Sequence, residues 1–262
     1  MNLAKEYLEK CIGLLKEIEE TQMENIQKAA DAIAECTMNG GIIHTFGSGH
    51  SLFVAQEPFH RAGGLQTVSS MPWSYFDSVA TKVGERTPGL GKAVVHWNDV
   101  RKGDVVICVS NSGVNALPVD VAIEAKKLGA TVIAITSLKG SKDASARGSG
   151  RSESGKKLYE VADIVLDNCG VPGDAILNVG LPYRIIATST GMGICIIQAV
   201  VGQAIGIMLE KGFNPPINIS HNIDVSKEIR EGNLERLKKW GDRYPIQYLI
   251  YHFAKADPAA IK

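Results

Sequence analysis

Two segments of this chain have the composition of loops that bind anions. In each, a short apolar run leads into a turn of glycine and serine, and a predicted helix follows: residues 42–46 precede Gly47-Ser48-Gly49-His50-Ser51, and residues 105–109 precede Ser110-Asn111-Ser112-Gly113. Glycine allows a positive φ and a close approach of the backbone to a ligand. The start of a helix offers free N–H groups and a positive dipole end, and serine hydroxyls suit phosphate oxygens. Two such loops in one chain predict a shared phosphate pocket.

The same loops lack the signatures of nucleotide sites. The chain contains neither a G-x-x-x-x-G-K-[ST] loop nor a G-x-G-x-x-G fingerprint, so a single phosphate on a sugar is the better ligand. No Asp or Glu, which would repel an anion, lies inside either loop. Thr188, Ser189 and Thr190 precede a later apolar helix and could complete the cradle, although N-capping explains them equally well. N-capping is also the alternative role of each loop serine, but caps alone do not require two matched loops.

Glu57 and His60 are the first candidates for acid–base chemistry on a bound sugar. Aldose–ketose exchange needs a base that moves a proton between neighbouring carbons, and glutamate or histidine suits this role. A helix over residues 51–62 would place both side chains on one face, about 10–14 Å beyond the phosphate loop. The alternatives are capping or pairing for Glu57 and a core position for His60. The pair could also hold a metal, but no second cluster at ligand spacing supports it, so we expect neither a metal nor another cofactor.

His221 is the third catalytic candidate. It lies in a polar stretch between a predicted apolar helix and a predicted charged helix. Its neighbours Ser220, Asn222 and Asp224 have side chains typical of helix caps, which leaves the histidine itself for function. We therefore favour a functional role for His221.

The composition is that of an ordinary globular protein. The 262 residues are 45% apolar and 21% charged, and 28 Lys and Arg balance 28 Asp and Glu. This balance gives no general attraction to nucleic acid or to a membrane. The N-terminus lacks the regions of a signal peptide, and glutamines and glycines interrupt the apolar residues 191–209, which indicates a buried helix. Five cysteines without a C-x-x-C pair predict a reduced, cytoplasmic protein.

Alternating strands and helices are expected to position these residues. Apolar positions recur at helical spacing over residues 2–38, which predicts a long helix. Beyond it we expect strands at 42–46, 65–69, 104–109, 131–136 and 163–166, and helices at 51–62, 115–128, 156–160, 188–209 and 225–240. The uniformly apolar strands predict a parallel sheet covered on both faces. The long connection 71–97 is typical of a functional lid or wall, and the polar residues 141–154 of a surface loop or flap.

The two loops, together with the alternating pattern over residues 42–209, resemble the sugar isomerase (SIS) domain family. The flanks are similar to its UPF0309 branch of phosphosugar isomerase-like proteins. The segments that carry this similarity are Ser154-Gly155-Lys156-Lys157-Leu158-Tyr159-Glu160-Val161-Ala162-Asp163 and Gly170-Val171-Pro172-Gly173-Asp174-Ala175. The resemblance implies a flavodoxin-like α/β/α sandwich with a five-stranded parallel sheet. It divides the chain into a helical extension at 1–40, a phosphosugar-binding domain at 41–212 and an irregular, helical tail at 213–262.

The resemblance also implies functions and site residues. Ser48, Ser51, Ser110, Asn111 and Ser112 are expected to contact phosphate or sugar hydroxyls, with Gly47 and Gly49 shaping the first loop. A homodimer or homotetramer is expected, in which His221 could enter a neighbour's site. The leading hypothesis is an aldose–ketose isomerase working through an enediolate. A non-catalytic sugar-phosphate sensor, an etherase and a deaminase remain alternatives, although the acidic N-terminal helix is poorly suited to nucleic acid.

Overall fold

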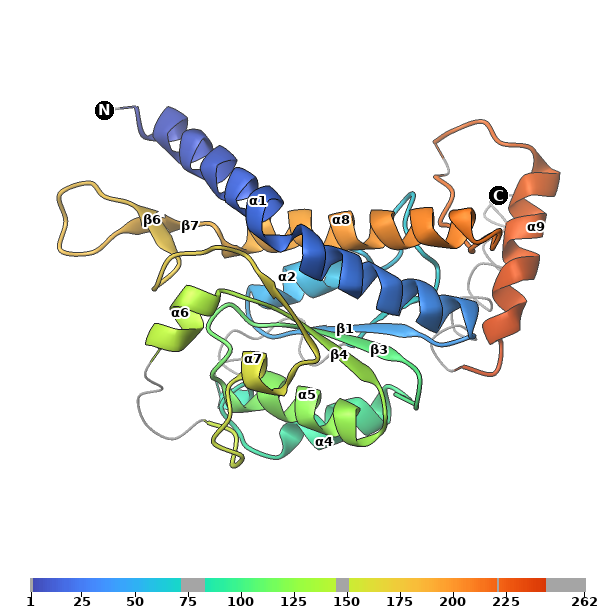
Figure 1. Ribbon diagram of the computed structural model, residues 1–262, viewed down its shortest axis with the longest axis horizontal. Helices are drawn as coiled ribbons and strands as arrows, with labels where there is room; N and C mark the ends of the chain where they lie inside the picture. Colours follow the sequence, from blue (N-terminus) through green and yellow to red (C-terminus); the bar gives the residue numbers. More distant parts are fainter. Residues whose placement is uncertain (1, 72–82, 145–150, 221, 244–262) are drawn as a thin grey trace, which may run out of the picture.

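The computed structural model describes residues 2–71, 83–144, 151–220 and 222–243. At its centre lies a sheet of five parallel strands in the order β2-β1-β3-β4-β5, with helices on both faces (Figure 1). The strands are β1 (Ile43–Gly47), β2 (Val68–Ser70), β3 (Val105–Val109), β4 (Thr131–Thr136) and β5 (Ile164–Asp167). The predicted α/β fold with a five-stranded parallel sheet is confirmed. In this strand order the sheet reverses its direction of growth between β1 and β3, where open α/β sheets bind their ligands.

The sequences of the central strands are continuously apolar because both of their faces are covered. In β3, Val105 and Ile107 belong to one apolar cluster, whereas Val106 and Cys108 belong to the other. This alternation follows from the two-residue period of a strand. No face of the central strands meets water, so apolar side chains stabilise both layers.

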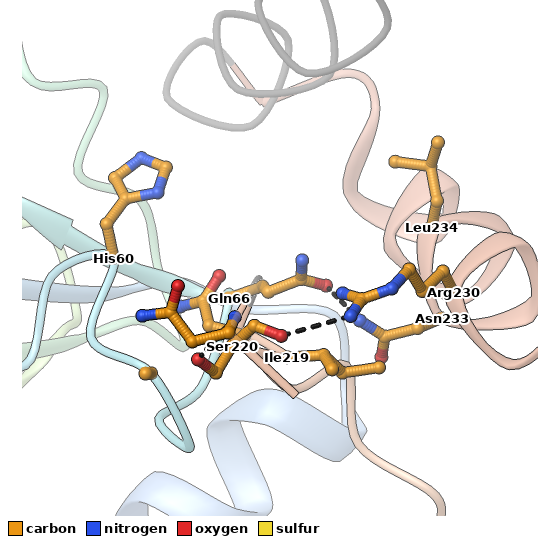
Figure 2. A pocket seen from close by; sticks show the side chains of 10 residues that line it. His60, Gln66, Ile219, Ser220, Arg230, Asn233 and Leu234 are labelled. Atoms are coloured by element: carbon orange, nitrogen blue, oxygen red, sulfur yellow. Dashed lines mark hydrogen bonds between the residues drawn. The ribbon is translucent and has the colours of Figure 1, made fainter. Parts of the chain in front are cut away.

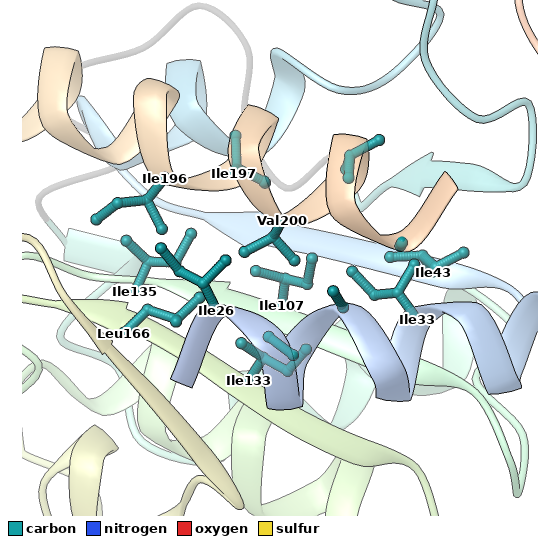
Figure 3. Packing of buried hydrophobic residues seen from close by; sticks show 14 of the residues in the cluster. Ile26, Ile33, Ile43, Ile107, Ile133, Ile135, Leu166, Ile196, Ile197 and Val200 are labelled. Carbon is teal, nitrogen blue, oxygen red and sulfur yellow. The ribbon is translucent and has the colours of Figure 1, made fainter. Parts of the chain in front are cut away.

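One face of the sheet is covered by α1 (Leu3–Met38), α2 (Ser51–Gln56) and α8 (Ser189–Glu210). α1 and α8 pack against each other across this face (Figure 1). Figure 3 shows Ile33 of α1 and Val200 of α8 packed over Ile107 and Ile133 of the sheet. The N-terminal helix therefore shares a core with the sheet, and the predicted division at residues 40 and 212 stays a prediction.

Among the described helices, α8 alone is long and apolar enough to cross a membrane. Half of its most apolar stretch is buried within the structure, where it contacts α1 and α2. The contacts of α8 with α1 and α2 therefore explain why the buried half of this helix is apolar.

The opposite face is covered by α4 (Leu90–Trp97), α5 (Ala116–Lys127) and α7 (Leu158–Val161). α4 and α5 approach closely at Gly91, where a Cβ atom would lie 2.4 Å from the backbone nitrogen of Val121. α4 was not predicted; it lies in the connection 71–97, for which no helix was expected. Residues 72–82 of this connection fall outside the described residues. α6 (Leu138–Asp143) likewise overlaps the predicted loop 141–154, of which residues 145–150 are not described.

Two other expectations about local structure were wrong. The helix predicted for 51–62 ends at Gln56. Pro58 has no N–H to continue the helix, and His60 takes a left-handed backbone with φ of 54°. Sequence analysis also missed the antiparallel hairpin of β6 (Ala175–Leu177) and β7 (Ile185–Ala187), whose strands are only three residues long.

The described part of the C-terminal tail packs at the amino ends of the strands. It forms α9 (Lys227–Leu237) and the 3-10 turn η1 (Lys238–Trp240), within the helix predicted for 225–240. The indole nitrogen of Trp240 donates a hydrogen bond of 3.0 Å to the carbonyl of Gly41. Trp240 and Leu237 bury Ile42 in a small apolar cluster of their own. The tail is thus fixed to the residue that precedes β1.

Beside Trp240, a buried ionic cluster joins the tail to the sheet. Arg243 donates to both carboxylate oxygens of Asp104, at 3.0 and 2.7 Å, and His44 Nε2 lies 3.3 Å from Asp104 Oδ2. The side chains of Asp104 and Arg243 are 1% and 5% exposed. Burial raises the pKa of the Asp104 carboxyl, but hydrogen bonds from His44 and Arg243 outweigh this effect and hold it well below its ordinary value. Asp104 therefore stays ionised and orients both partners.

Replacing Asp104 with Asn should destabilise the protein by about 3–5 kcal/mol, because Arg243 would keep its charge in a buried site after losing the carboxylate that accepts two of its hydrogen bonds. Urea unfolding followed by circular dichroism measures this loss. Asp99→Asn is the matched control, since Asp99 also contacts Arg243 but its side chain is 31% exposed. Equal free energies of unfolding for the wild type and Asp104→Asn would contradict the role of this cluster.

His44 should make stability depend on pH. Burial lowers the pKa of His44, although neighbouring Asp104 acts in the opposite direction. As pH falls through about 6.5, the unfolded chain takes up a proton that the native imidazole does not bind, so the free energy of unfolding decreases. We expect a lower urea midpoint at pH about 5.5 than at about 7.5, and a smaller difference in His44→Gln, which cannot titrate. The same difference in both proteins would exclude His44 as its source.

Candidate functional site

The β1–β3 pairing places the two Gly/Ser loops side by side. Gly47, the last residue of β1, is in register with Val109, the last residue of β3. The first loop therefore begins at Ser48 next to the second loop at Ser110. A Cβ atom at Gly47 would lie 2.3 Å from the carbonyl oxygen of Ser51, so only glycine allows the first turn of α2 to fold back over the strand end.

Four of the predicted binding residues line one narrow crevice between these loops and α8. They are Ser51, Asn111, Ser189 and Thr190, and the remaining walls come from Val54, Val109, Ile135 and Asn168. The crevice has a cavity volume of about 10 Å³, enough for about one water molecule. It can therefore hold the oxygens of one anionic group at its mouth, whereas the body of a larger ligand would lie outside it.

Asn168, which sequence analysis missed, fixes the orientation of Asn111. The backbone N–H of Gly170 donates to Asn168 Oδ1 at 2.9 Å, so the Asn168 amide must present its NH₂ group on the other side. That NH₂ donates to Asn111 Oδ1, also at 2.9 Å. The Asn111 NH₂ group is consequently left as a donor for a ligand. The available sequence signal was that Asn168 follows the last predicted strand, at the same edge of the sheet as both loops.

Ser48 is held by a carboxylate that sequence analysis also missed. Its hydroxyl donates a 3.3 Å hydrogen bond to Glu85 Oε2, while Arg86 Nη1 lies 2.7 Å from Glu85 Oε1. A hydroxyl has one hydrogen, so in this arrangement Ser48 can offer a ligand only its acceptor lone pairs. Glu85 lies in the connection 71–97, whose unusual length was the only sequence signal for a functional wall.

The second loop keeps more of its donors available. Ser110 Oγ accepts a hydrogen bond from the Gly113 backbone N–H at 3.2 Å, so its own hydrogen can be donated elsewhere. Gly113 has φ of 61°, and Gly49 of the first loop has φ of 57°. These two turns thus depend on glycine. Ser112 is half-buried beside them.

At the start of α8, a carboxylate of the chain itself occupies the position expected for an anion. Asp174 Oδ1 accepts from the backbone N–H groups of Thr188 and Ser189, at 3.1 and 2.9 Å, and Asp174 Oδ2 accepts from the Ser189 hydroxyl at 2.6 Å. The Thr188 hydroxyl is buried and has no hydrogen-bond partner among the described residues. Asp174 therefore caps α8 and engages the Ser189 hydroxyl, whereas the Thr188 and Thr190 hydroxyls do not contact this carboxylate.

Glu57 and His60 do not share a helix face. Glu57 is oriented by Arg61 Nε at 3.2 Å and Gln198 Nε2 at 3.3 Å, both on Oε1. His60 lies beyond the end of α2 and lines a different pocket, near Gln66, with no residue in common with the crevice. Partial burial lowers the pKa of His60. His221 lies outside the described residues, and no three His, Cys, Asp or Glu side chains in the described part of the chain gather as a metal site.

Comparison with known proteins gives one consistent family. A family model described as the SIS domain matches residues 6–137. A UPF0309 protein of Geobacillus thermodenitrificans is 40% identical over 248 residues, covering 92% of this chain and 96% of the relative. A UPF0309 protein of Listeria monocytogenes is 37% identical, covering 85% of this chain and 92% of the relative.

Solved structures with the same fold include an enzyme and a sugar-phosphate complex. Phosphoheptose isomerase from Neisseria gonorrhoeae matches with a TM-score of 0.54 at 19% identity, covering 78% of this chain and 98% of the isomerase. The NanR protein of Vibrio vulnificus, solved in complex with ManNAc-6P, matches with a TM-score of 0.51 at 12% identity, covering 80% and 64% of the two chains. At these identities the likeness shows the fold.

Asn168→Asp should weaken the binding of inorganic phosphate about tenfold. A carboxylate at this position cannot donate, so the Asn111 amide would turn its NH₂ toward it and present an oxygen to the anion. Isothermal titration with inorganic phosphate measures the change. Asn178→Asp is the control, because Asn178 is exposed on the β6–β7 hairpin and the charge change is the same. Unchanged affinity in Asn168→Asp would show that Asn111 is not a phosphate donor.

Proposed function

The chain belongs to the SIS-domain family, with the UPF0309 proteins among its relatives, and on this premise we propose that it isomerises a phosphorylated sugar between aldose and ketose forms. The phosphate would sit at the mouth of the crevice, at the carboxyl ends of β1 and β3. The observation that carries this proposal is the Asn111 amide, which Asn168 turns so that its NH₂ is available to an anion. A donor held in this way loses little freedom when it binds a ligand.

The remaining phosphate contacts would come from residues whose donors are available. Ser51 and Thr190 line the crevice beside Asn111, and Ser110 retains its hydroxyl hydrogen. Ser112 and the backbone around Gly49 would complete the cradle. Ser48 would contribute to it only after its hydroxyl leaves Glu85, and Ser189 only after leaving Asp174.

Glu57 is the base in this proposal. Arg61 and Gln198 both donate to Oε1, which leaves Oε2 to accept a proton. Glu57 lies six residues after Ser51, about 9 Å along the helix axis, so the carbonyl end of a sugar anchored by its phosphate could reach it. Oε2 would take the proton from the carbon next to the carbonyl, forming the enediolate, and return it to the former carbonyl carbon.

A second acid–base group must move protons between the two sugar oxygens. We assign this role to His221, acting from a neighbouring copy in a homodimer or homotetramer. His60 would take no part in it, because it lines the other pocket. Glu85 would stand near the phosphate end, where its position next to Ser48 suits control of loop geometry better than proton transfer.

We place this activity in the cytoplasm, with a small phosphorylated sugar as the partner rather than nucleic acid or a membrane. The thiols support a reducing compartment, since the five cysteines form no disulfide. Burial raises the pKa of Cys36 to about 12, which keeps that thiol protonated and unreactive.

Hydrogen exchange tests the reaction. Incubation with hexose, pentose, heptose and amino-sugar phosphates in D₂O should place deuterium on the carbon next to the carbonyl of one of them, as measured by proton NMR. Glu57→Gln should slow this exchange by about 10²–10⁴-fold, because the amide cannot accept the proton. Glu210→Gln, at the exposed end of α8, is the matched control.

The other outcomes separate the alternative functions. Binding of a sugar phosphate without exchange or turnover would favour a sensor, and release of lactate or ammonia would indicate ether cleavage or deamination. Exchange that persists at full rate in Glu57→Gln would reject Glu57 as the base. The absence of binding across the panel would reject the proposed substrate class.

A further inference from the structure

A second pocket lies at the end of the sheet opposite the crevice. It has a cavity volume of about 400 Å³, within the range of small-molecule sites. Its described walls come from three segments: the turn after α2, residues 218–220 with Asn222, and one face of α9. Figure 2 shows His60 on one side of this pocket and Arg230 and Leu234 of α9 on the other. It shares no lining residue with the crevice.

The framework of this pocket is held by hydrogen bonds. Asn233 accepts from the backbone N–H of Ile217 at 3.0 Å and donates to Gln66 Oε1 at 3.3 Å, which joins α9 to the segment before β2. Residues 62–66 and 216–218 are also joined by their backbones, through Asn218 N–H to Gly64 O at 2.8 Å and Gly63 N–H to Asn218 O at 2.7 Å. The pocket is therefore built into the fold rather than left between loose segments.

One lining side chain is buried with a donor that no described residue satisfies. Asn218 is only 9% exposed, and its Nδ2 atom has no hydrogen-bond partner among the described residues. Leaving a buried amide N–H group unpaired is unfavourable, so such a group points to a missing acceptor. Asn218 lines the pocket, where a ligand oxygen could supply that acceptor.

The charge of the pocket favours an anion. No Asp or Glu is among the described residues that line it, whereas Arg230 contributes a guanidinium. Arg230 Nη2 donates to the carbonyls of Ser220 and Ile223, at 3.1 and 3.0 Å, which fixes the side chain and leaves Nη1 for a ligand. Within the described residues Arg230 forms no ion pair, so no carboxylate among them neutralises its charge. Ile219 and Leu234 supply apolar walls for the carbon body of a ligand.

We propose that this pocket is a second binding site, separate from the isomerase site, for a small organic anion whose phosphate or carboxylate meets Arg230 and whose hydroxyl or carbonyl oxygen meets Asn218. His60 belongs to this second site as a neutral hydrogen-bonding wall residue. The inference does not rest on the proposed isomerase function, because its argument uses Asn218 and Arg230, which are not among the described residues that line the crevice.

Methyl NMR distinguishes the two sites in the full-length protein. The δ1 methyl of Ile219 reports on the pocket, and that of Ile135 reports on the crevice. The probes are glucose 6-phosphate, gluconate and glucose, each at up to about 10 mM. A saturable shift of Ile219 with glucose 6-phosphate identifies a phosphate ligand, and one with gluconate a carboxylate ligand, whereas uncharged glucose should not shift it.

Asn218→Asp replaces the unpaired donor by a negative charge and should weaken the Ile219 response at least tenfold, with the Ile135 response retained. Asn2→Asp, at the exposed start of α1, is the control for charge. Arg230→Gln is the second variant and should weaken the same response without removing the whole side chain. The proposal is overturned if neither anion shifts the Ile219 methyl signal, or if glucose shifts it as much as the anions do. It is also overturned if both variants bind the anions as tightly as the wild type does. Loss of the Ile135 response alone would count against the isomerase site only.

Discussion

The pairing of β1 with β3 is the constraint on which the candidate site depends. Its register sets Gly47 opposite Val109, so both chains leave the sheet at the same level and their loops start side by side. The helices that follow then separate, α2 to the face of α1 and α8, and α5 to the opposite face. The crevice lies between the two loops and the start of α8, at the point where the sheet changes its direction of growth. Both strands are buried on both faces, so a register shift would disrupt two cores at once.

Within that crevice, the number of free hydrogens decides which polar groups can bind an anion. Ser48 and Ser189 have the residue type expected of phosphate contacts, yet each gives its hydrogen to a carboxylate of the chain, Glu85 and Asp174. Asn111 has its NH₂ left available because a neighbouring amide occupies its oxygen. The same hydrogen-bonding groups that suit phosphate also stabilise the fold, since most buried polar groups in proteins have a hydrogen-bond partner.

The two ends of the sheet differ in the structures that they support. The carboxyl ends carry the paired loops, whereas the amino ends hold the tail through a buried cluster of Asp104, Arg243 and His44. Such a cluster stabilises only as a complete set, because each charge depends on its partner. The tail also contains α9, which supplies one wall of the second pocket. His60 faces that pocket although it is only three residues from Glu57.

The sequence by itself determined the parallel α/β sheet, the long N-terminal helix and the loops that follow β1 and β3. These features depend on local periodicity, on glycine and on uniformly apolar strands, which can be read without knowing what packs where. Only the tertiary structure decided which predicted residues meet. It brought Asn168 to Asn111, Glu85 to Ser48 and Gln198 to Glu57, across 57, 37 and 141 positions of the chain. Hydrogen bonds over such separations depend on strand order and helix packing, and the pattern of nearby residues does not contain them.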